Sequence, residues 1–113
     1  MNIITVTVAN GSNLSVATQM AADIQYVKQP QYLTGLYIPT IDAAIVYLRA
    51  SVDRINFARM LKTDGSGDWN VAIGTGDRWI FLDQLAPFPY IQIELSANQT
   101  ADRVFKFVQD VIM

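Results

Sequence analysis

The sequence predicts an all-β fold, a sandwich or barrel of about eight short strands in a single domain over residues 1–113. Segments in which apolar and polar residues alternate recur along the chain, and this two-residue period is typical of strands. Gly, Pro and Asp residues separate these segments, as the turns of a sandwich or barrel require. Nine of the ten acidic residues are Asp, which favours turns, and only Glu94 is Glu, which favours helices.

The chain begins with an expected strand over residues 3–9, where β-branched residues dominate the sequence "IITVTVA". Asn10-Gly11 follows, a pair that tolerates the positive φ values of a tight turn. We therefore expect residues 12–19 to pair back as a second strand. Residues 15–28 fit both a capped helix and a strand, and the strand is preferred because apolar and polar residues also alternate there.

Two apolar segments on either side of Pro39 are expected to be separate strands. Residues 31–38 ("QYLTGLYI") end at that proline, which cannot donate a ladder hydrogen bond. Residues 43–51 ("AAIVYLRAS") contain the longest apolar run and are expected to form a central strand. Residues 55–61 ("INFARML") alternate again and predict a further strand.

The remaining segments are predicted to alternate between turns and strands. In chain order they are a turn at 63–68, a strand at 69–73, a turn at 74–77, a strand at 78–83, an irregular bridge at 85–89 and a strand at 90–95. The bridge holds two prolines, which exclude regular pairing. Residues 100–112 fit either a helix capped by Thr100 or a last strand with Phe105 and Phe107 on one face.

Composition excludes several classes of function. The chain has no cysteine and no histidine, so it lacks disulfides, a thiolate nucleophile, a Ser-His pair and the commonest ligands of zinc. Eight basic residues against ten acidic ones give a net charge of −2, which is not the footprint of a nucleic-acid-binding protein. No apolar run approaches the roughly 18–20 residues of a membrane span, and the first residues lack the pattern of a secretory signal. We expect a soluble protein that is made in a cytoplasm.

The low charge predicts an assembly. Charged residues make up 16% of the chain and hydrophobic residues 51%, whereas an ordinary globular domain has about 25% charged residues. A small domain has much surface to keep in water, so a shortage of charge predicts that neighbouring molecules cover part of it. The sequence therefore favours a homo-oligomer or a larger assembly.

Two glycine-rich segments could bind ions, but both are expected to be turns. Asp64, Ser66 and Asp68 have the spacing of the first three ligands of a calcium loop, yet the bidentate Glu of such a loop is missing. Residues 74–77 ("GTGD") faintly resemble a phosphate cradle, yet neither a Lys-Ser/Thr pair nor a helix follows. Turn chemistry explains both segments more simply, so no metal and no cofactor is expected.

The acidic residues predict no catalytic site. Five aspartates fall at predicted turns, where solvated aspartates are common: Asp53, Asp64, Asp68, Asp77 and Asp83. Acid–base catalysis by carboxyl groups needs two that face each other across a cleft, and the pattern supports no such pair. We expect no catalytic residues and no enzymatic activity.

Aromatic residues leave sugar binding open as an alternative. The candidates for a stacking platform at the edge of a sandwich are Tyr26, Tyr32, Tyr37, Tyr47, Trp69, Trp79 and Tyr90. Aromatic side chains also dominate cores and interfaces. Trp69, which alternates with apolar residues, is expected in the core, and Trp79 in the core or in an interface.

Several segments, in matching order over nearly the whole chain, resemble a family of small virion-associated proteins of tailed bacteriophages and prophages. They are "VTVANGSNLSVA", "LTGLYIPT", "AAIVYLRASVDRINFARMLKTDG", "DRWIFLDQLAPFPYIQIEL" and "TADRVFKF". Each motif is short and mostly apolar. The family has a discoidin-like (galactose-binding-like) fold, so the resemblance implies a single-domain jelly-roll β-sandwich of about eight strands.

The resemblance also implies particular strand ends. It expects a strand ended by Pro39, a strand closed by Ser51, Asp53 and Phe57, a strand at Tyr90–Ile93 and a closing strand at Ala101–Arg103. One position departs from the family pattern: Arg54 stands where a glycine is expected after Asp53, so the turn there is expected to be reshaped. The resemblance implies no catalytic residue and transfers no sugar-contacting position.

The expected function is that of a virion structural protein, a decoration or cement protein on the outside of the capsid. It would act as a homo-oligomer, for example a trimer, bound to the major capsid protein or to other virion proteins, without nucleic acid or membrane. The alternatives are a place in the tail, neck or fibre base, or a carbohydrate-binding adhesion module that recognises a surface glycan. The apolar end "DVIM" is expected to be an ordinary last strand, with a clip onto a neighbour as the alternative.

Overall fold

The computed structural model describes residues 2–19, 31–62, 64–85 and 90–111, and in these ranges the chain is all-β, without a helix. The strands are β1 (Asn2–Val8), β2 (Thr18–Gln19), β3 (Gln31–Ser51), β4 (Ala58–Arg59), β5 (Ala72–Leu85), β6 (Tyr90–Leu95) and β7 (Arg103–Val111). This confirms the predicted all-β class. It also decides the C-terminal ambiguity, because Arg103–Val111 is a strand and both Phe105 and Phe107 are fully buried.

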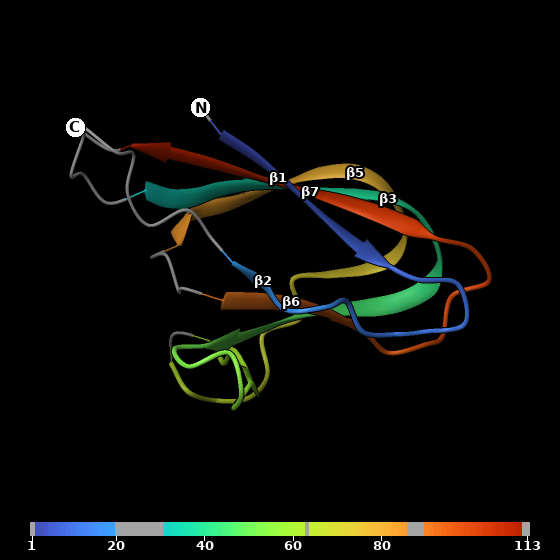
Figure 1. Ribbon diagram of the computed structural model, residues 1–113, viewed down its shortest axis with the longest axis horizontal. Coiled ribbons are helices and arrows are strands. Elements are labelled where there is room, and N and C mark those ends of the chain that lie inside the picture. The colour runs from blue at the N-terminus through green and yellow to red at the C-terminus, as the bar shows by residue number, and fades with distance from the viewer. Residues whose placement is uncertain (1, 20–30, 63, 86–89, 112–113) are drawn as a thin grey trace.

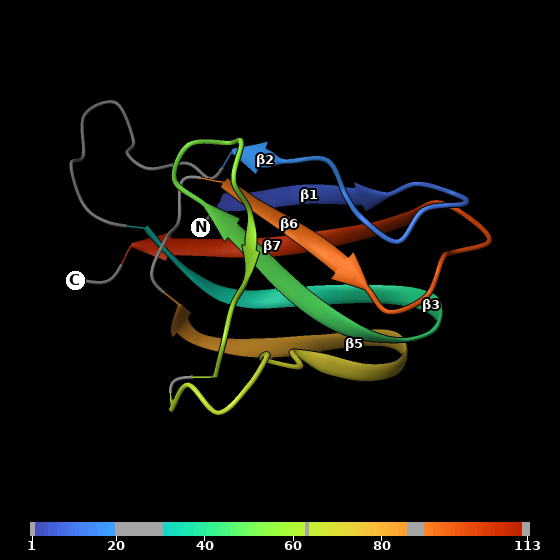
Figure 2. The same ribbon diagram turned by 90° about the horizontal axis from the view of Figure 1, so that it is seen from below.

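All seven strands belong to one antiparallel sheet that folds over on itself and nearly closes into a barrel (Figures 1 and 2). The path is β1-β7-β3-β6-β2, and β4 and β5 pair with β3. The first part of β3 pairs with β7 and the last part with β6. Strand β3 therefore belongs to two layers, one formed with β1 and β7 and the other with β6, β2 and β4, and β5 follows β3 from the first layer into the second. The length of β3 is what lets one sheet enclose a core.

The corner between the layers overturns two predictions. Pro39 does not end a strand, and Gly74–Asp77 is not a turn between strands, because β3 and β5 run through these positions. The β3–β5 ladder shifts register between Thr40 and Ala44, so the proline lies at an irregular part of the ladder. Gly76 has a φ of 80°, and a Cβ there would lie 1.9 Å from the carbonyl oxygen of Pro39. The glycine allows β5 to bend against β3.

The expected hairpin between residues 3–9 and 12–19 is also wrong. Gly11 does adopt a positive φ, but its N–H donates to the carbonyl of Gln99, and the next residues follow the loop before β7. Strand β2 pairs with β6, and Leu14 forms a bridge with Glu94. The turn residues permitted a reversal, but the tertiary partner of the returning segment is β6. Residues 20–28 of the ambiguous segment lie outside the described residues.

Residues 55–61 form much less strand than their alternation predicts. Only Ala58–Arg59 pairs with β3, and Leu61 forms an isolated bridge to Asp68. Ile55 is 81% exposed, so the alternation there does not mark a face toward the core. The strand expected at 69–73 begins at Ala72. Most of the bridge at 85–89, and the last two residues of the apolar terminus, lie outside the described ranges.

The core lies between the two layers and follows the two-residue period of the strands. Its fully buried members include Val8, Leu33, Leu36, Ile91, Ile93, Leu95, Phe105 and Phe107. In β6 the alternation is complete, since Ile91, Ile93 and Leu95 are buried and the residues between them are half-buried. Outside the core, each layer has its own outer face, and these two faces differ in character.

Candidate functional site

The outer face of the layer β1-β7-β3-β5 carries apolar side chains that no segment covers in the described part of the chain, together with Thr5, Thr7 and Lys106. We call these apolar side chains the apolar face: Ile3, Tyr37, Trp79, Phe81, Val104 and Val108. Trp79 is 59% exposed and Phe81 is 76% exposed, and Ile3 and Val104 are also exposed. Single exposed apolar residues are common on proteins, but a contiguous group of them marks an interaction surface.

Strand register places these residues side by side. Ile3 lies opposite Val108, Val108 opposite Gly35, and Gly35 opposite Phe81, so one row crosses four strands (Figures 1 and 2). Directly opposed residues in antiparallel strands share a face. Gly35 adds no side chain to this row, and the other three members of the row are apolar.

The neighbouring row adds aromatic and polar groups. Tyr37 lies opposite Trp79, with ring centroids 5.2 Å apart and the rings tilted by 50°. The Tyr37 hydroxyl donates a hydrogen bond of 3.1 Å to Oδ1 of Asp77, and the Lys106 ammonium lies 5.9 Å from the Tyr37 ring centre. The hydrogen bond to the Asp77 carboxylate, followed by burial and its negative charge, raises the pKa of the Tyr37 phenol. The phenol therefore remains a hydrogen-bond donor at neutral pH.

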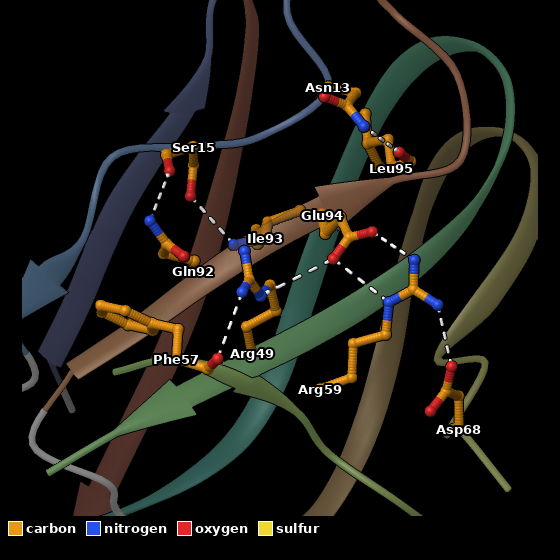
Figure 3. A network of polar contacts seen from close by, with 10 residues as sticks. All are labelled: Asn13, Ser15, Arg49, Phe57, Arg59, Asp68, Gln92, Ile93, Glu94 and Leu95. Atoms are coloured by element: carbon orange, nitrogen blue, oxygen red, sulfur yellow. Dashed lines mark hydrogen bonds and ion pairs between the residues drawn. The ribbon is translucent and has the colours of Figure 1, made fainter. Parts of the chain in front are cut away.

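The outer face of the other layer is polar and covered by the chain itself. Arg59 on β4 donates to both oxygens of Glu94 on β6, and its Nη1 lies 2.8 Å from Oδ2 of Asp68 (Figure 3). The Arg59 guanidinium also lies 4.1 Å from the ring centre of Tyr47. Nη2 of Arg49 donates to the carbonyl oxygen of Phe57 at 3.2 Å. We call Arg49, Arg59, Asp68 and Glu94 the polar network.

The polar network links β4 and Asp68 to β3 and β6. Backbone bonds support it, since Met60 N–H donates to the Leu48 carbonyl and Trp69 N–H donates to the Met60 carbonyl. The hydrogen bond from Arg59 is the main cause that lowers the pKa of Glu94, and it outweighs the effect of partial burial. Charged groups on this face thus find partners within the chain, so this layer presents no unpaired charge from the network to a ligand.

The two segments considered for ion binding are occupied by internal contacts. Oδ1 of Asp64 accepts a 2.9 Å bond from the N–H of Ser66, which lowers the pKa of Asp64 and forms a turn. Asp68 is engaged by Arg59 and does not join Asp64. Across the described ranges no group of three or more acidic side chains comes together in a way that could hold a metal ion. Gly74–Asp77 lies inside β5 and forms no anion cradle at a helix N-terminus.

Asp53 organises the turn after β3, where the family resemblance expected a glycine at the next position. Its Oδ1 accepts from the N–H groups of Asn56 and Ile55 and from the Ser51 hydroxyl. These bonds, with that of Asn56 first, lower the pKa of Asp53. Arg54 has a φ of 66°, so it keeps the left-handed conformation that favours glycine. Residue 54 therefore has a backbone conformation that glycine adopts without strain.

The aromatic candidates are separated by the fold. Trp69 is half-buried against the core, which agrees with the prediction, whereas Trp79 is exposed and does not belong to the core. Tyr47 lies under Arg59 and Tyr90 lies 5.8 Å from the Arg54 guanidinium, away from the apolar face. Tyr26 and the side chain of Tyr32 lie outside the described part. The structure brings together only Tyr37 and Trp79, and adds Phe81, which the sequence did not single out.

Sequence reasoning also missed a hydrogen-bond cluster around the buried Gln99, in the loop before β7. The Gln99 side chain is 1% exposed, its Oε1 accepts from the N–H of Asp42, and its Nε2 donates to the Ala97 carbonyl. The Asp42 carboxylate in turn accepts from the Thr100 N–H and from Arg103, and the bond from Thr100 is the first cause that lowers its pKa. A single Gln in a turn does not indicate burial, so the sequence could not predict this hydrogen-bond cluster.

Comparison with known proteins gives no match: no protein-family model, no curated protein and no solved structure corresponds to the chain. The resemblance to phage virion proteins therefore rests on sequence motifs alone. Among the described residues, no helix has the length and apolar character needed to cross a membrane.

Proposed function

We propose that this chain is a structural protein of a tailed-bacteriophage particle, a decoration protein that binds the outside of the capsid through the apolar face. The observation that carries the proposal is the exposure of Trp79 and Phe81 on β5, on the same sheet face as the exposed Ile3 of β1 and Val104 of β7. Burying such a surface stabilises an assembly by about 25 cal/mol for each Å² of apolar area. The motif resemblance supplies the virion as the setting, and the task needs no catalytic group.

We also propose that the folded sheet is a jelly-roll sandwich of the galactose-binding-like type. What supports this is the division of the strands into two layers that share β3, with the core residues alternating inward from both. A decoration protein needs such a rigid body, because a preformed surface loses little entropy on docking. An experimental structure that shows two packed sheets with jelly-roll connections would support this proposal, and an open single sheet would refute it.

The test of the proposed function begins with purified particles of the phage that encodes the chain. Cryo-electron microscopy should show its density repeated over the whole head. Density only at the tail, neck or one vertex would favour the alternative location, and absence from the particle would refute both virion roles. The same particles, stripped of the protein, allow a binding assay with variants.

The matched variants are Val104→Lys on the apolar face and Ile55→Lys in the bend that follows β3. Both replace an exposed apolar residue, since Val104 is 41% and Ile55 is 81% exposed. Val104→Lys should weaken co-sedimentation with stripped heads by about tenfold or more, which corresponds to about 1.4 kcal/mol. Ile55→Lys should bind as the unmodified protein does. Equal binding of both variants would show that another surface docks.

A second candidate function, glycan binding, is favoured by one observation. Trp79 and Tyr37 present aromatic rings next to the Asp77 carboxylate, a combination that can stack on a sugar ring and accept its hydroxyl hydrogens. A glycan array with the unmodified protein and with Trp79→Ala would test it. Specific signals that Trp79→Ala abolishes would support a carbohydrate-binding adhesion module, and an array without signals would refute it.

A further inference from the structure

The outer edge of β5 is an unprotected strand edge that borders the apolar face. Over Arg78–Phe81, β5 pairs one residue for one residue with Gly35–Ile38 of β3. No described residue pairs with the opposite edge of this segment. Natural sheets protect free edges with Pro, Lys, bulges or very short strands, and "RWIFL" (78–82) contains no Pro, Lys or Gly.

We propose that this edge pairs with the same edge of a second copy of the chain, antiparallel and across a two-fold axis at Ile80. The regular part of the ladder covers Arg78–Phe81, between Asp77, whose φ is 55°, and the register shift that follows Phe81, so an axis at Ile80 lies within it. Residues that oppose each other in the two strands must point to the same face of the sheet. Registers in which an outward residue would oppose an inward one are therefore excluded. The arrangement is isologous, because each copy offers the same segment.

The register centred on Ile80 is the one that pairs the two exposed aromatic residues with each other. It sets Trp79 opposite Phe81 of the second copy, and Phe81 opposite Trp79 of the second copy, so the two exposed aromatics form two cross-strand pairs. Aromatic cross-strand pairs stabilise antiparallel ladders. A register centred on Arg78 would oppose two arginines at the axis. A register centred on Trp79 would oppose Asp77 to Phe81 of the second copy.

The size of the apolar face gives an independent reason for the pairing. Four strands about 4.8 Å apart and about five residues long cover roughly 300 Å² of flat surface. A specific interface buries about 800 Å² on each partner. The apolar face of one copy is therefore too small for a specific interface. Two copies joined at β5 present a continuous face of about 600 Å², before the residues around its rim are counted. The inference deepens the proposed function, and rests on it only for the capsid that the doubled face would meet.

The other free edge of this layer is less suited to self-pairing. Strand β1 pairs only with β7, but Thr5 and Thr7 are among its outward residues, and it carries no aromatic residue. Pairing through β5 closes after two copies, so we expect a dimer in place of the trimer considered from the sequence.

Size-exclusion chromatography with light scattering tests the stoichiometry. The measured mass of the unmodified protein should be twice the chain mass of 12.6 kDa, and the dimer should dissociate on dilution. A monomer at the highest soluble concentration, or a trimer, would overturn the inference. Phe81→Lys should shift the dissociation constant by about tenfold or more toward the monomer, whereas Val104→Lys, on the same face but on β7, should leave it unchanged.

Engineered cysteines test the register, because the chain has no cysteine of its own. Ile80→Cys should cross-link with itself under mild oxidation, since residues directly opposed in antiparallel strands have Cα atoms about 4.5–5.5 Å apart, within disulfide range. Trp79→Cys should cross-link efficiently with Phe81→Cys after subunit exchange. Neither should cross-link well alone, because two copies of residue 79 would lie about 8 Å apart.

Val104→Cys is the matched control, since Val104 is exposed on the same face but lies on β7. Cross-linking of Val104→Cys as efficient as that of Ile80→Cys would overturn the edge pairing. The two proposals fail separately. A dimer with the Ile80 register that is absent from particles refutes the capsid role alone, and a monomer that binds particles refutes the edge pairing alone.

Discussion

The two outer faces of the folded sheet come from the same strands and yet differ in how their residues are used. On the layer β6-β3-β4, charged residues pair with one another and link β4 and Asp68 to β6. On the layer β1-β7-β3-β5, side chains such as Trp79 and Phe81 are exposed, and no described segment covers them. Lys106 is the cation beside Tyr37 on this apolar face.

The difference shows where the chain is complete in itself and where it is open to a partner. The polar network satisfies its own charges, and exposed ion pairs of this kind contribute little to binding another molecule. The apolar face has no internal partner for its hydrophobic surface, and burying that surface would be favourable. Four substitutions test this contrast.

The largest effect is expected at the corner that joins the two layers. Gly76→Ala should lower the free energy of unfolding by about 3 kcal/mol or more, because its Cβ would meet the Pro39 carbonyl and its positive φ disfavours a side chain. Chemical denaturation monitored by tryptophan fluorescence measures the loss. The control is Gly65→Ala, which also has a positive φ but meets nothing within 4 Å, and should cost only about 1 kcal/mol. Equal losses would show that contact with Pro39 is unimportant.

The next effect tests the polar network. Glu94→Gln should lower the free energy of unfolding by about 1 kcal/mol at pH 7, because the exposed Arg59 guanidinium loses the charged acceptor that the half-buried Glu94 provides. The Glu94 pKa is lower in the folded than in the unfolded chain, so its contribution is present above the unfolded pKa near 4.5. This stabilising contribution is lost as the pH falls through the pKa that Glu94 has in the folded chain.

The difference in stability between the unmodified chain and Glu94→Gln should therefore shrink below pH 4.5. Denaturation curves of both proteins between pH 7 and pH 2 measure it. Asp42, Asp53 and Asp64 also have lowered pKa values, but they titrate in both proteins and cancel in the difference. A difference that is constant over this range would mean that the charge of Glu94 does not contribute.

A smaller effect on stability is expected on the apolar face. Phe81→Ser should change the free energy of unfolding by less than about 1 kcal/mol, because the ring is 76% exposed and has cross-strand contacts only. The same substitution should weaken self-association by about tenfold or more, which light scattering over a dilution series measures. If Phe81→Ser lowered the free energy of unfolding as much as Glu94→Gln does, the ring would stabilise the monomer itself and not only the contact with a partner.

The smallest effect is expected in the turn that follows β3. Arg54→Gly should raise the free energy of unfolding by about 0.5 kcal/mol, because relief of the positive φ outweighs the added entropy of the unfolded chain. Arg54→Ala keeps a Cβ and loses the contact with Tyr90, so it should be no more stable than the unmodified chain. Thermal unfolding of the three proteins gives the order. Stabilisation by both substitutions would place the strain in the Arg54 side chain and not in its φ.

The sequence by itself determined the fold class and most of the strand faces. Alternation in β1 and β6 sets which residues are buried, because a residue's side in a strand follows from its position alone. The turn at Asp64 and the left-handed residue Gly11 also follow from local chemistry. These features depend on neighbours in the chain, so a linear pattern contains them.

Only the tertiary structure decided which strands pair and which face is covered. Pro39 and Gly74–Asp77 look like ends of strands, yet the chain continues through them because a folded sheet needs a bent corner there. Trp79 has the pattern of a core residue, but strand register puts it beside Tyr37 on an outer face. Glu94 and Arg59 are 35 positions apart and meet only because β4 and β6 flank β3. Pairing across such distances depends on the packing of the whole sheet, which no local pattern encodes.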